Sequence, residues 1–202
     1  MGQFLEIAAD KPRNLNWTVV NVADRPGVAK LDLTKLPTPY TDNQFDGIYS
    51  EHFIEHMYKY QGINFFKEAF RILKPGGVIR TVWPPYEFVE KLVSDEQLTP
   101  DEQNFVASYH KFYVVNHNFA GKGHSKRSLR EQCALGLLYQ NGEHLYVWPK
   151  KEMIEVLNDI GFVRVKECDY MKSSKPEFTG IDTPGVIRAL HSAVVEAQKP
   201  WS

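Results

Sequence analysis

Four residues, Lys74-Pro75-Gly76-Gly77, separate a helical pattern from a strand pattern, and this boundary restricts the fold more than any other feature of the chain. Before it, apolar residues recur with helical spacing over 52–73, with a break near Gly62. After it, the run 78–83 (VIRTVW) is rich in residues that favour strands. Because proline and glycine end helices and glycine readily adopts a left-handed turn, we predict helix, turn and strand in that order.

Further strands are predicted by short apolar or β-branched runs at 4–9, 17–22, 29–33, 45–50, 163–167 and 190–196. About seven residues separate the first two runs, which is too few for a crossover helix, so we predict a loop there. Strands that alternate with helices predict a mostly parallel sheet covered on both faces. Ligands of such sheets bind beyond the carboxyl ends of the strands.

The middle of the chain predicts an insertion of helices rather than further sheet. Helical pieces are expected over 87–92, 100–112 and 128–139, and insertions of this kind commonly form a lid or a substrate wall. A later helix is bracketed by Pro149 at its start and Gly161 just beyond its end.

The composition fits one domain that is neither strongly charged nor rich in cysteine. With 202 residues, 43% of them hydrophobic, the chain can form one substantial core. A net charge of -1 gives no reason to expect a nucleic-acid or anionic-membrane partner, and no apolar run is long enough to span a bilayer. Cys133 and Cys168 lie far apart, which favours a reducing, cytoplasmic location. We predict a single domain over 1–202 with a helical insertion at about 84–142.

Two segments carry a family resemblance: FDGIYSEHFIEHM (45–57) and FFKEAFRILKPGGVIRTVWP (65–84). They resemble the centre of the class I S-adenosylmethionine-dependent methyltransferases, particularly the methyltransferase type 11 group. The resemblance implies an α/β, three-layer Rossmann-like fold with a mostly parallel seven-stranded sheet and an antiparallel last strand. It also implies S-adenosylmethionine as the cofactor and S-adenosylhomocysteine as the product.

The cofactor motif of that family is degenerate here. In LEIAAD (5–10), Glu6 matches the family's acidic residue, whereas Ala8 and Asp10 stand where glycines are expected. Asp10 adds a negative charge beside a ligand that carries a carboxylate, unless the side chain turns outward or a cation such as Lys11 or Arg13 offsets it. Carried over by position, the cofactor-binding residues are Glu6, Ala8, Ala9, Asp10, Asn21, Asp24, Asp32, Leu33 and Ser50.

Several of these residues have an alternative role. Glu6 could cap backbone groups, and Asp32 could form a turn with Thr34 instead of meeting adenine. The ribose-binding position after the second strand is held by Ala23 or, one residue later, by Asp24.

His52 and His56 lie four residues apart on one predicted helix face, just past the fourth strand. With Glu51 or Glu55 they suggest a metal site, but the sequence offers no third convergent ligand, so we predict none. We predict instead that one of these histidines is a general base.

The resemblance implies transfer of a methyl group to an O or N atom of an acceptor, which we expect to be a small molecule. A second hypothesis is a catalytically silent binding or scaffold domain that keeps the fold but has lost cofactor binding, and the replaced glycines favour it.

Overall fold

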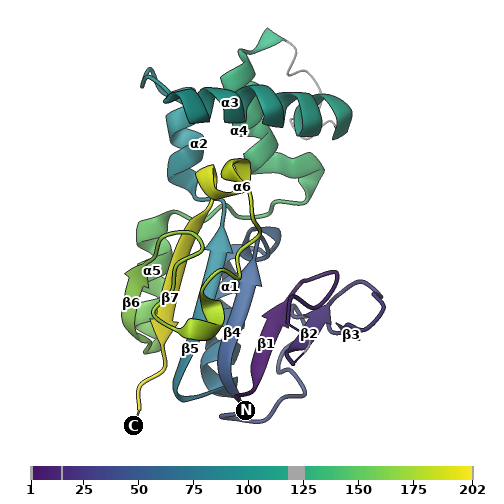
Figure 1. Ribbon diagram of the computed structural model, residues 1–202, viewed down its shortest axis with the longest axis vertical. Coiled ribbons are helices and arrows are strands. Elements are labelled where there is room, and N and C mark those ends of the chain that lie inside the picture. Colours follow the sequence, from purple (N-terminus) through teal and green to yellow (C-terminus); the bar gives the residue numbers. More distant parts are fainter. Residues whose placement is uncertain (1, 15, 118–125, 202) are drawn as a thin grey trace.

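A computed structural model describes residues 2–14, 16–117 and 126–201. Within them, seven strands form one sheet in the order β3-β2-β1-β4-β5-β7-β6 (Figure 1). The strands are β1 Phe4–Ile7, β2 Thr18–Asn21, β3 Ala29–Lys30, β4 Phe45–Glu51, β5 Leu73–Trp83, β6 Val163–Glu167 and β7 Ala193–Gln198. The first five strands run parallel, and β7 is antiparallel to both β5 and β6. The predicted sheet is therefore confirmed.

Strands β1 and β2 are joined by a loop, as their short separation predicted. The described residues of this connection form no helix, and the Ala8 amide donates a hydrogen bond to the Val20 carbonyl at 2.8 Å. Strand β3 is shorter than the predicted run 29–33, because Leu33 leaves the sheet and packs into the core.

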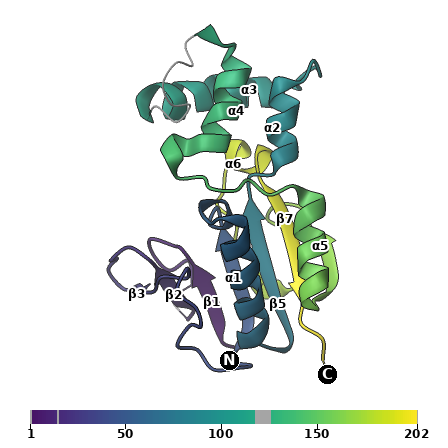
Figure 2. The ribbon, with the colours of Figure 1, turned by 180° about the vertical axis from the view of Figure 1, so that it is seen from behind.

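Helices α1 (Lys59–Ile72) and α5 (Lys150–Ile160) cover one face of the sheet (Figure 2). The predicted break near Gly62 is wrong, because Gly62 lies inside α1 and a Cβ there would come within 2.8 Å of the Trp148 ring. The glycine allows close packing. The interruption comes earlier, after the short 3-10 helix η1 (Ile54–His56). Gly76 has a φ of +77°, as a turn predicts, but β5 already begins at Leu73, so residues 74–77 interrupt the start of this strand instead of preceding it.

The segment between β6 and β7 covers the other face, so the helices expected there are replaced by a connection that contains the 3-10 helix η5 (Pro176–Phe178). Arg80, fully buried on β5, fixes this segment to the sheet. Its guanidinium donates to Asp182 Oδ1 at 2.9 Å and to Glu196 Oε1 at 2.8 Å. A buried, paired cation thus joins the segment to β5 and β7.

The remaining helices pack together beyond the carboxyl ends of the parallel strands (Figures 1 and 2). They are α2 Tyr86–Val93, α3 Pro100–Tyr109, the π-helical η2 His110–Val115, α4 Leu129–Tyr139, the 3-10 helix η4 Gln140–Gly142 and α6 Val186–Leu190. They have an apolar cluster of their own. Leu190, predicted to begin the last strand, ends α6 instead. Every helix in the described part of the chain is too short or too polar to cross a lipid bilayer.

Candidate functional site

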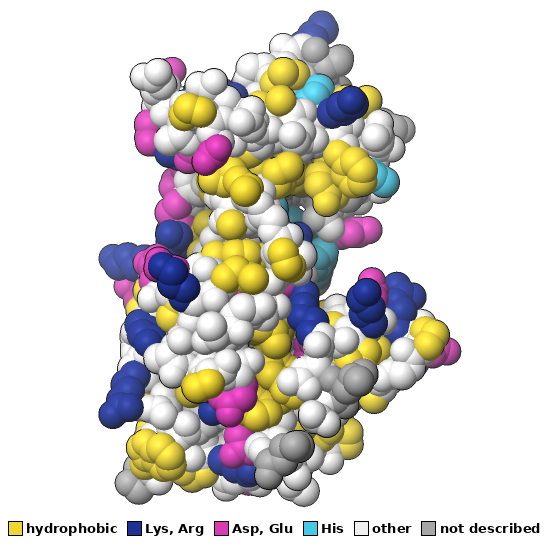
Figure 3. All heavy atoms as spheres, in the orientation of Figure 1, with side chains coloured by type: hydrophobic (Ala, Val, Ile, Leu, Met, Phe, Trp, Pro, Cys, Tyr) yellow, Lys and Arg dark blue, Asp and Glu magenta, His cyan; other side chains and the backbone are white. Residues whose placement is uncertain are grey.

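A cavity of about 580 Å³, the site pocket, opens at the carboxyl ends of β1, β2 and β4. Strand β1 lies between β2 and β4, so the pocket sits where the strand order reverses, which is the usual ligand position in open α/β sheets. Figure 3 shows histidine side chains in the hollow between the helical end and the strands β1 to β3. The predicted site residues that line the pocket are Ala8, Asp10, Asn21, Asp32, Leu33, His52 and His56.

Ala8 keeps the backbone shape of the glycine that it replaces. Its φ is +60°, in the left-handed region that a Cβ disfavours. The loop after β1 therefore has the path that a glycine would favour, and the alanine side chain strains it.

The Asp10 carboxylate is exposed and paired. The Arg25 Nε donates to Asp10 Oδ1 at 2.7 Å, so Arg25 supplies the offsetting cation. Neither Lys11 nor Arg13, the two cations that the sequence suggested, is paired with Asp10 in the described contacts. Arg13 instead binds Glu6 and Glu51, with its Nη1 2.6 Å from Glu6 Oε1 and its Nη2 2.7 Å from Glu51 Oε2.

Glu6 is fully buried beneath the loop after β1 and is not part of the pocket lining. Its Oε2 accepts the backbone amide of Arg13 at 3.1 Å, and Oε1 accepts the guanidinium. Glu51, at the end of β4, is buried beside it. Burial raises the pKa of the Glu51 carboxyl, but hydrogen bonds from Thr183 and the charges of Arg13 and Arg188 outweigh burial and lower that pKa to about 2.

Asn21 is the last residue of β2 and lines the pocket. Its amide holds neighbouring backbone, donating to the Ala9 carbonyl at 3.2 Å and accepting the Ala23 amide at 2.9 Å. Asp24 is exposed and lies outside the lining, as does Ala9. Of the residues at the end of β2 that the sequence suggested, Asn21 is the one that faces the pocket.

Asp32 forms the turn that was its alternative role and also lines the pocket. Its Oδ1 accepts from the Thr34 amide at 3.0 Å and from the Thr34 hydroxyl at 2.6 Å, and these hydrogen bonds lower the pKa of the carboxyl. Leu33 is buried and contributes an apolar surface. Ser50 is buried away from the lining, with its hydroxyl 3.2 Å from that of Thr81.

His52 and His56 both line the pocket, but only His56 lies in a helix, the 3-10 helix η1, which also carries the buried Glu55. His52 follows β4 with a φ of +48°, and its Nε2 is 2.8 Å from the Ser192 hydroxyl. Glu55 is fully buried, and His52 Nδ1 approaches its Oε1 to 3.3 Å without forming a hydrogen bond.

The fold adds a residue here that the sequence analysis did not select, His144, whose ring centroid is 4.9 Å from that of His56. Burial lowers the pKa of the His144 imidazole. The third convergent side chain that the sequence lacked is thus supplied by a segment almost ninety positions away, and no local pattern marks it.

Known proteins share part of this sequence and the fold of the chain. Residues 5–81 match the family described as methyltransferase domain. No curated protein matches the chain. Among solved structures, a Thermotoga maritima protein described as a possible histamine N-methyltransferase aligns over 98% of this chain and 83% of its own, with a TM-score of 0.54 and 17% identity.

Two further structures show the same likeness. The 1,6-didemethyltoxoflavin-N1-methyltransferase of Burkholderia thailandensis aligns over 98% of this chain and 71% of its own, with a TM-score of 0.52 and 14% identity. CurJ carbon methyltransferase aligns over 98% of this chain at a TM-score of 0.52 and 13% identity, and this chain spans 48% of that protein.

The protein has the class I methyltransferase fold. The family match over 5–81 agrees with the resemblance seen in the sequence, and the structures that align along the chain share its fold. Within this methyltransferase fold, the site pocket lies at the end of the sheet where the degenerate motif residues Ala8 and Asp10 meet the end of β2.

Proposed function

We propose that the protein is an S-adenosylmethionine-dependent methyltransferase that methylates an O or N atom of a small acceptor. The observation that carries this proposal is the site pocket. It lies at the reversal of strand order, and it is lined from three segments that the family resemblance assigned to the cofactor, the loop after β1, the end of β2 and the loop after β3, and from the turn after β4 that carries the candidate bases.

The pocket residues form three groups, and each group suits one part of S-adenosylmethionine. The apolar surface of Leu33 and the Asp32 turn suit an adenine ring, and the end of β2 at Asn21 suits the ribose. The amino-acid portion of the donor, which carries a carboxylate, suits the Ala8 loop near Arg25, a cation on the same lining. In support, the Burkholderia thailandensis methyltransferase with this fold was solved with bound S-adenosylhomocysteine.

Methyl transfer needs alignment more than covalent help from the protein. The acceptor atom forms a bond to the methyl carbon while the bond from carbon to the sulfonium sulfur breaks, leaving its electron pair on sulfur. Holding donor and acceptor in line supplies roughly 7–11 kcal/mol. A base then takes the acceptor's proton.

His56 is the better placed of the two predicted bases. Its Nδ1 faces the Glu143 carbonyl at 3.1 Å, so Nδ1 carries the proton and Nε2 has a lone pair. The ring nitrogens of His52 face Ser192 and Glu55, and we assign His52 the positioning of that turn.

A second cavity, of about 740 Å³, lies among the helices and shares no lining residue with the site pocket. It is lined by aromatic side chains, including Tyr109 and Phe112, and by Arg188. The sequence left open whether these aromatic residues pack the insertion or line a pocket, and Tyr109 does both.

Cys133 and Cys168 are free thiols, which supports the proposed cytoplasmic location.

The catalytically silent domain is the second candidate, and one observation favours it: Glu6 and Asp10 are both already paired with arginines. These ion pairs stabilise the loop after β1 with no cofactor bound, as a domain that no longer binds one would require.

Calorimetric titration with S-adenosylhomocysteine tests the two functions against each other. We compare the parent with Val22→Trp, which fills the pocket from an exposed lining position, and with Val93→Trp, an equally exposed valine at the end of α2. Binding by the parent and by Val93→Trp, with loss in Val22→Trp, supports the enzyme. No heat with any variant at millimolar ligand supports the silent domain.

A further inference from the structure

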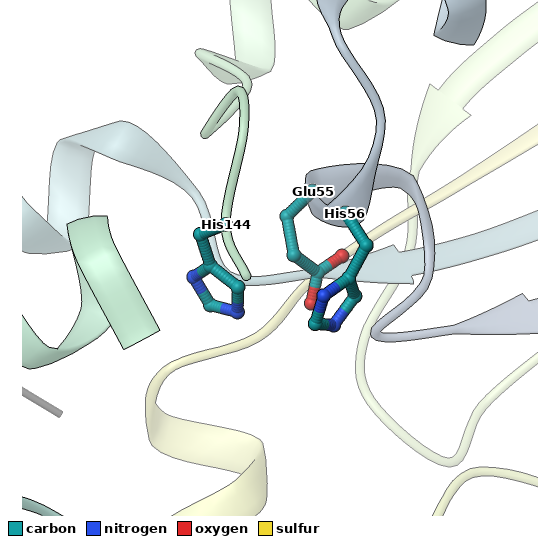
Figure 4. Close-up of side chains that lie close together, drawn as sticks. All are labelled: Glu55, His56 and His144. Carbon is teal, nitrogen blue, oxygen red and sulfur yellow. The ribbon is translucent and has the colours of Figure 1, made fainter. Parts of the chain in front are cut away.

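Three side chains with metal-ligating atoms converge at the edge of the site pocket. The carboxylate of Glu55 and the imidazoles of His56 and His144 each offer one ligand atom, and these atoms all lie within 4.8 Å of one another. Figure 4 shows the side chains of Glu55 and His56, from η1, pointing toward that of His144 in the segment after η4. The backbone carbonyl of Glu55 accepts the amides of Leu145 and Tyr146, at 2.8 and 3.2 Å, and so fixes the two segments together.

The Glu55 carboxylate has an unmet need for a partner. The residue is fully buried, and among the described residues neither of its carboxylate oxygens has a hydrogen-bond partner. Most buried polar groups in proteins are satisfied, and an ionised carboxylate is costly to bury unless it is paired or coordinates a metal. The nearest group that could carry a positive charge is the His52 imidazole, whose Nδ1 lies 3.3 Å from Glu55 Oε1. Glu55 Oε2 has no such neighbour in the described contacts.

Each of the two histidines has a backbone carbonyl at its Nδ1 atom. His56 Nδ1 faces the Glu143 carbonyl at 3.1 Å, and His144 Nδ1 faces the Leu137 carbonyl. A carbonyl oxygen can only accept, so each Nδ1 carries a proton, and in the neutral imidazole the lone pair is on Nε2. A backbone carbonyl bound to the second ring nitrogen is the usual support of metal-ligating histidines.

We propose that Glu55, His56 and His144 form a binding site for a zinc ion. Two imidazoles and one carboxylate are a zinc ligand set, whereas magnesium and calcium prefer oxygen ligands alone. Three protein ligands leave the fourth tetrahedral position for water or substrate, as in catalytic zinc sites. The proposal replaces the sequence-based prediction of no metal, which rested on the missing third ligand.

The position gives the ion a role if the proposed function holds. His56 lines the site pocket, and His144 lines a small cavity of about 50 Å³ together with His52 and Tyr109. A zinc ion there lies between the donor pocket and the helices, where it can bind an acceptor hydroxyl or thiol and lower its pKa. The lone pair of His56 then serves the metal, and the acceptor's proton leaves to water. This role rests on the proposed function, whereas zinc binding itself does not.

The test is zinc binding by the full chain after dialysis against a chelator. Titration with zinc chloride in competition with a chromophoric chelator gives the affinity, and elemental analysis after gel filtration gives the stoichiometry. We expect one zinc per chain and a melting temperature raised by roughly 5–10 °C at zinc concentrations about 100 times Kd. Replacement by cobalt(II) tests the ligand geometry without any variant, because a low-coordinate site gives intense visible bands and an octahedral site pale ones.

Three variants identify the ligands. Glu55→Gln and His144→Gln should weaken zinc binding by more than about 100-fold, beyond the loss typical of outer-sphere partners. His110→Gln, at a histidine that hydrogen-bonds Gln132 away from the cluster, should bind as the parent does. Melting without zinc shows whether the variants fold.

No zinc retained at micromolar concentration, a pale cobalt spectrum, or unchanged affinity in Glu55→Gln overturns the site. A parallel titration with S-adenosylhomocysteine separates the two proposals. If the protein binds zinc but not S-adenosylhomocysteine, the metal site is supported and the methyltransferase is rejected. If it binds S-adenosylhomocysteine but not zinc, the methyltransferase is supported and the metal site is rejected.

Discussion

The strained backbone at Ala8 gives the most quantitative prediction about the site. Its φ of +60° is a left-handed conformation, which costs a residue with a Cβ about 1–2 kcal/mol. Ala8→Gly removes that cost in the folded state but gives the unfolded chain more freedom, which offsets about 0.4–1 kcal/mol. The balance is a stabilisation of about 0.5–1 kcal/mol. For a chain of this length that is a melting temperature raised by about 1–4 °C.

Ala9→Gly is the matched control, because the backbone of Ala9 is outside the left-handed φ region that Ala8 occupies. The same chemical change there should lower the unfolding free energy by about 0.5–1 kcal/mol. Urea denaturation and thermal melting of the two variants and the parent measure both effects. If Ala8→Gly destabilises the protein as much as Ala9→Gly does, the strain assigned to Ala8 is not present and the loop does not keep a glycine-like path.

Three further predictions concern the Asp10 charge in the site pocket, the backbone at Gly76 and the loss of stability at acid pH. Asp10→Gly should tighten S-adenosylhomocysteine binding several-fold, by about 1 kcal/mol, because it removes a carboxylate and releases Arg25, and calorimetry showing equal or weaker binding would contradict this. Gly76→Val should lower the unfolding free energy by about 2 kcal/mol or more, because its φ is +77° and its side chain would meet the Trp201 ring; an unchanged melting temperature would refute the turn assignment. The folded Glu51 carboxyl has a pKa of about 2 against 4.5 unfolded, so its contribution of about 3 kcal/mol is present above the unfolded pKa and is lost as pH falls from 4.5 toward 2. Urea titrations across that window should show this loss in the parent and less of it in Glu51→Gln.

Local patterns were enough to predict most elements. The helix between Pro149 and Gly161 was found because its cap residues are adjacent to it in sequence. The break near Gly62 was misplaced because the reason for that glycine is Trp148, a tertiary contact that helical periodicity does not contain.

The site was predictable to the extent that it follows strand ends. Ala8, Asp32 and His52 could be assigned because parallel strands present their carboxyl ends at one edge. Partners from distant positions could not be assigned. The pairing of Asp10 with Arg25 and the approach of His144 to Glu55 depend on loop paths that no local spacing encodes.

The structure of the protein with S-adenosylhomocysteine tests the central claim most directly. We predict that crystals grown or soaked with millimolar ligand show the adenosyl group in the site pocket, against Leu33 and Asp32, with the sulfur directed toward the turn that carries His52. An unliganded pocket at that concentration, or the ligand bound elsewhere on the molecule, would contradict the claim that this end of the sheet is a methyl-donor site.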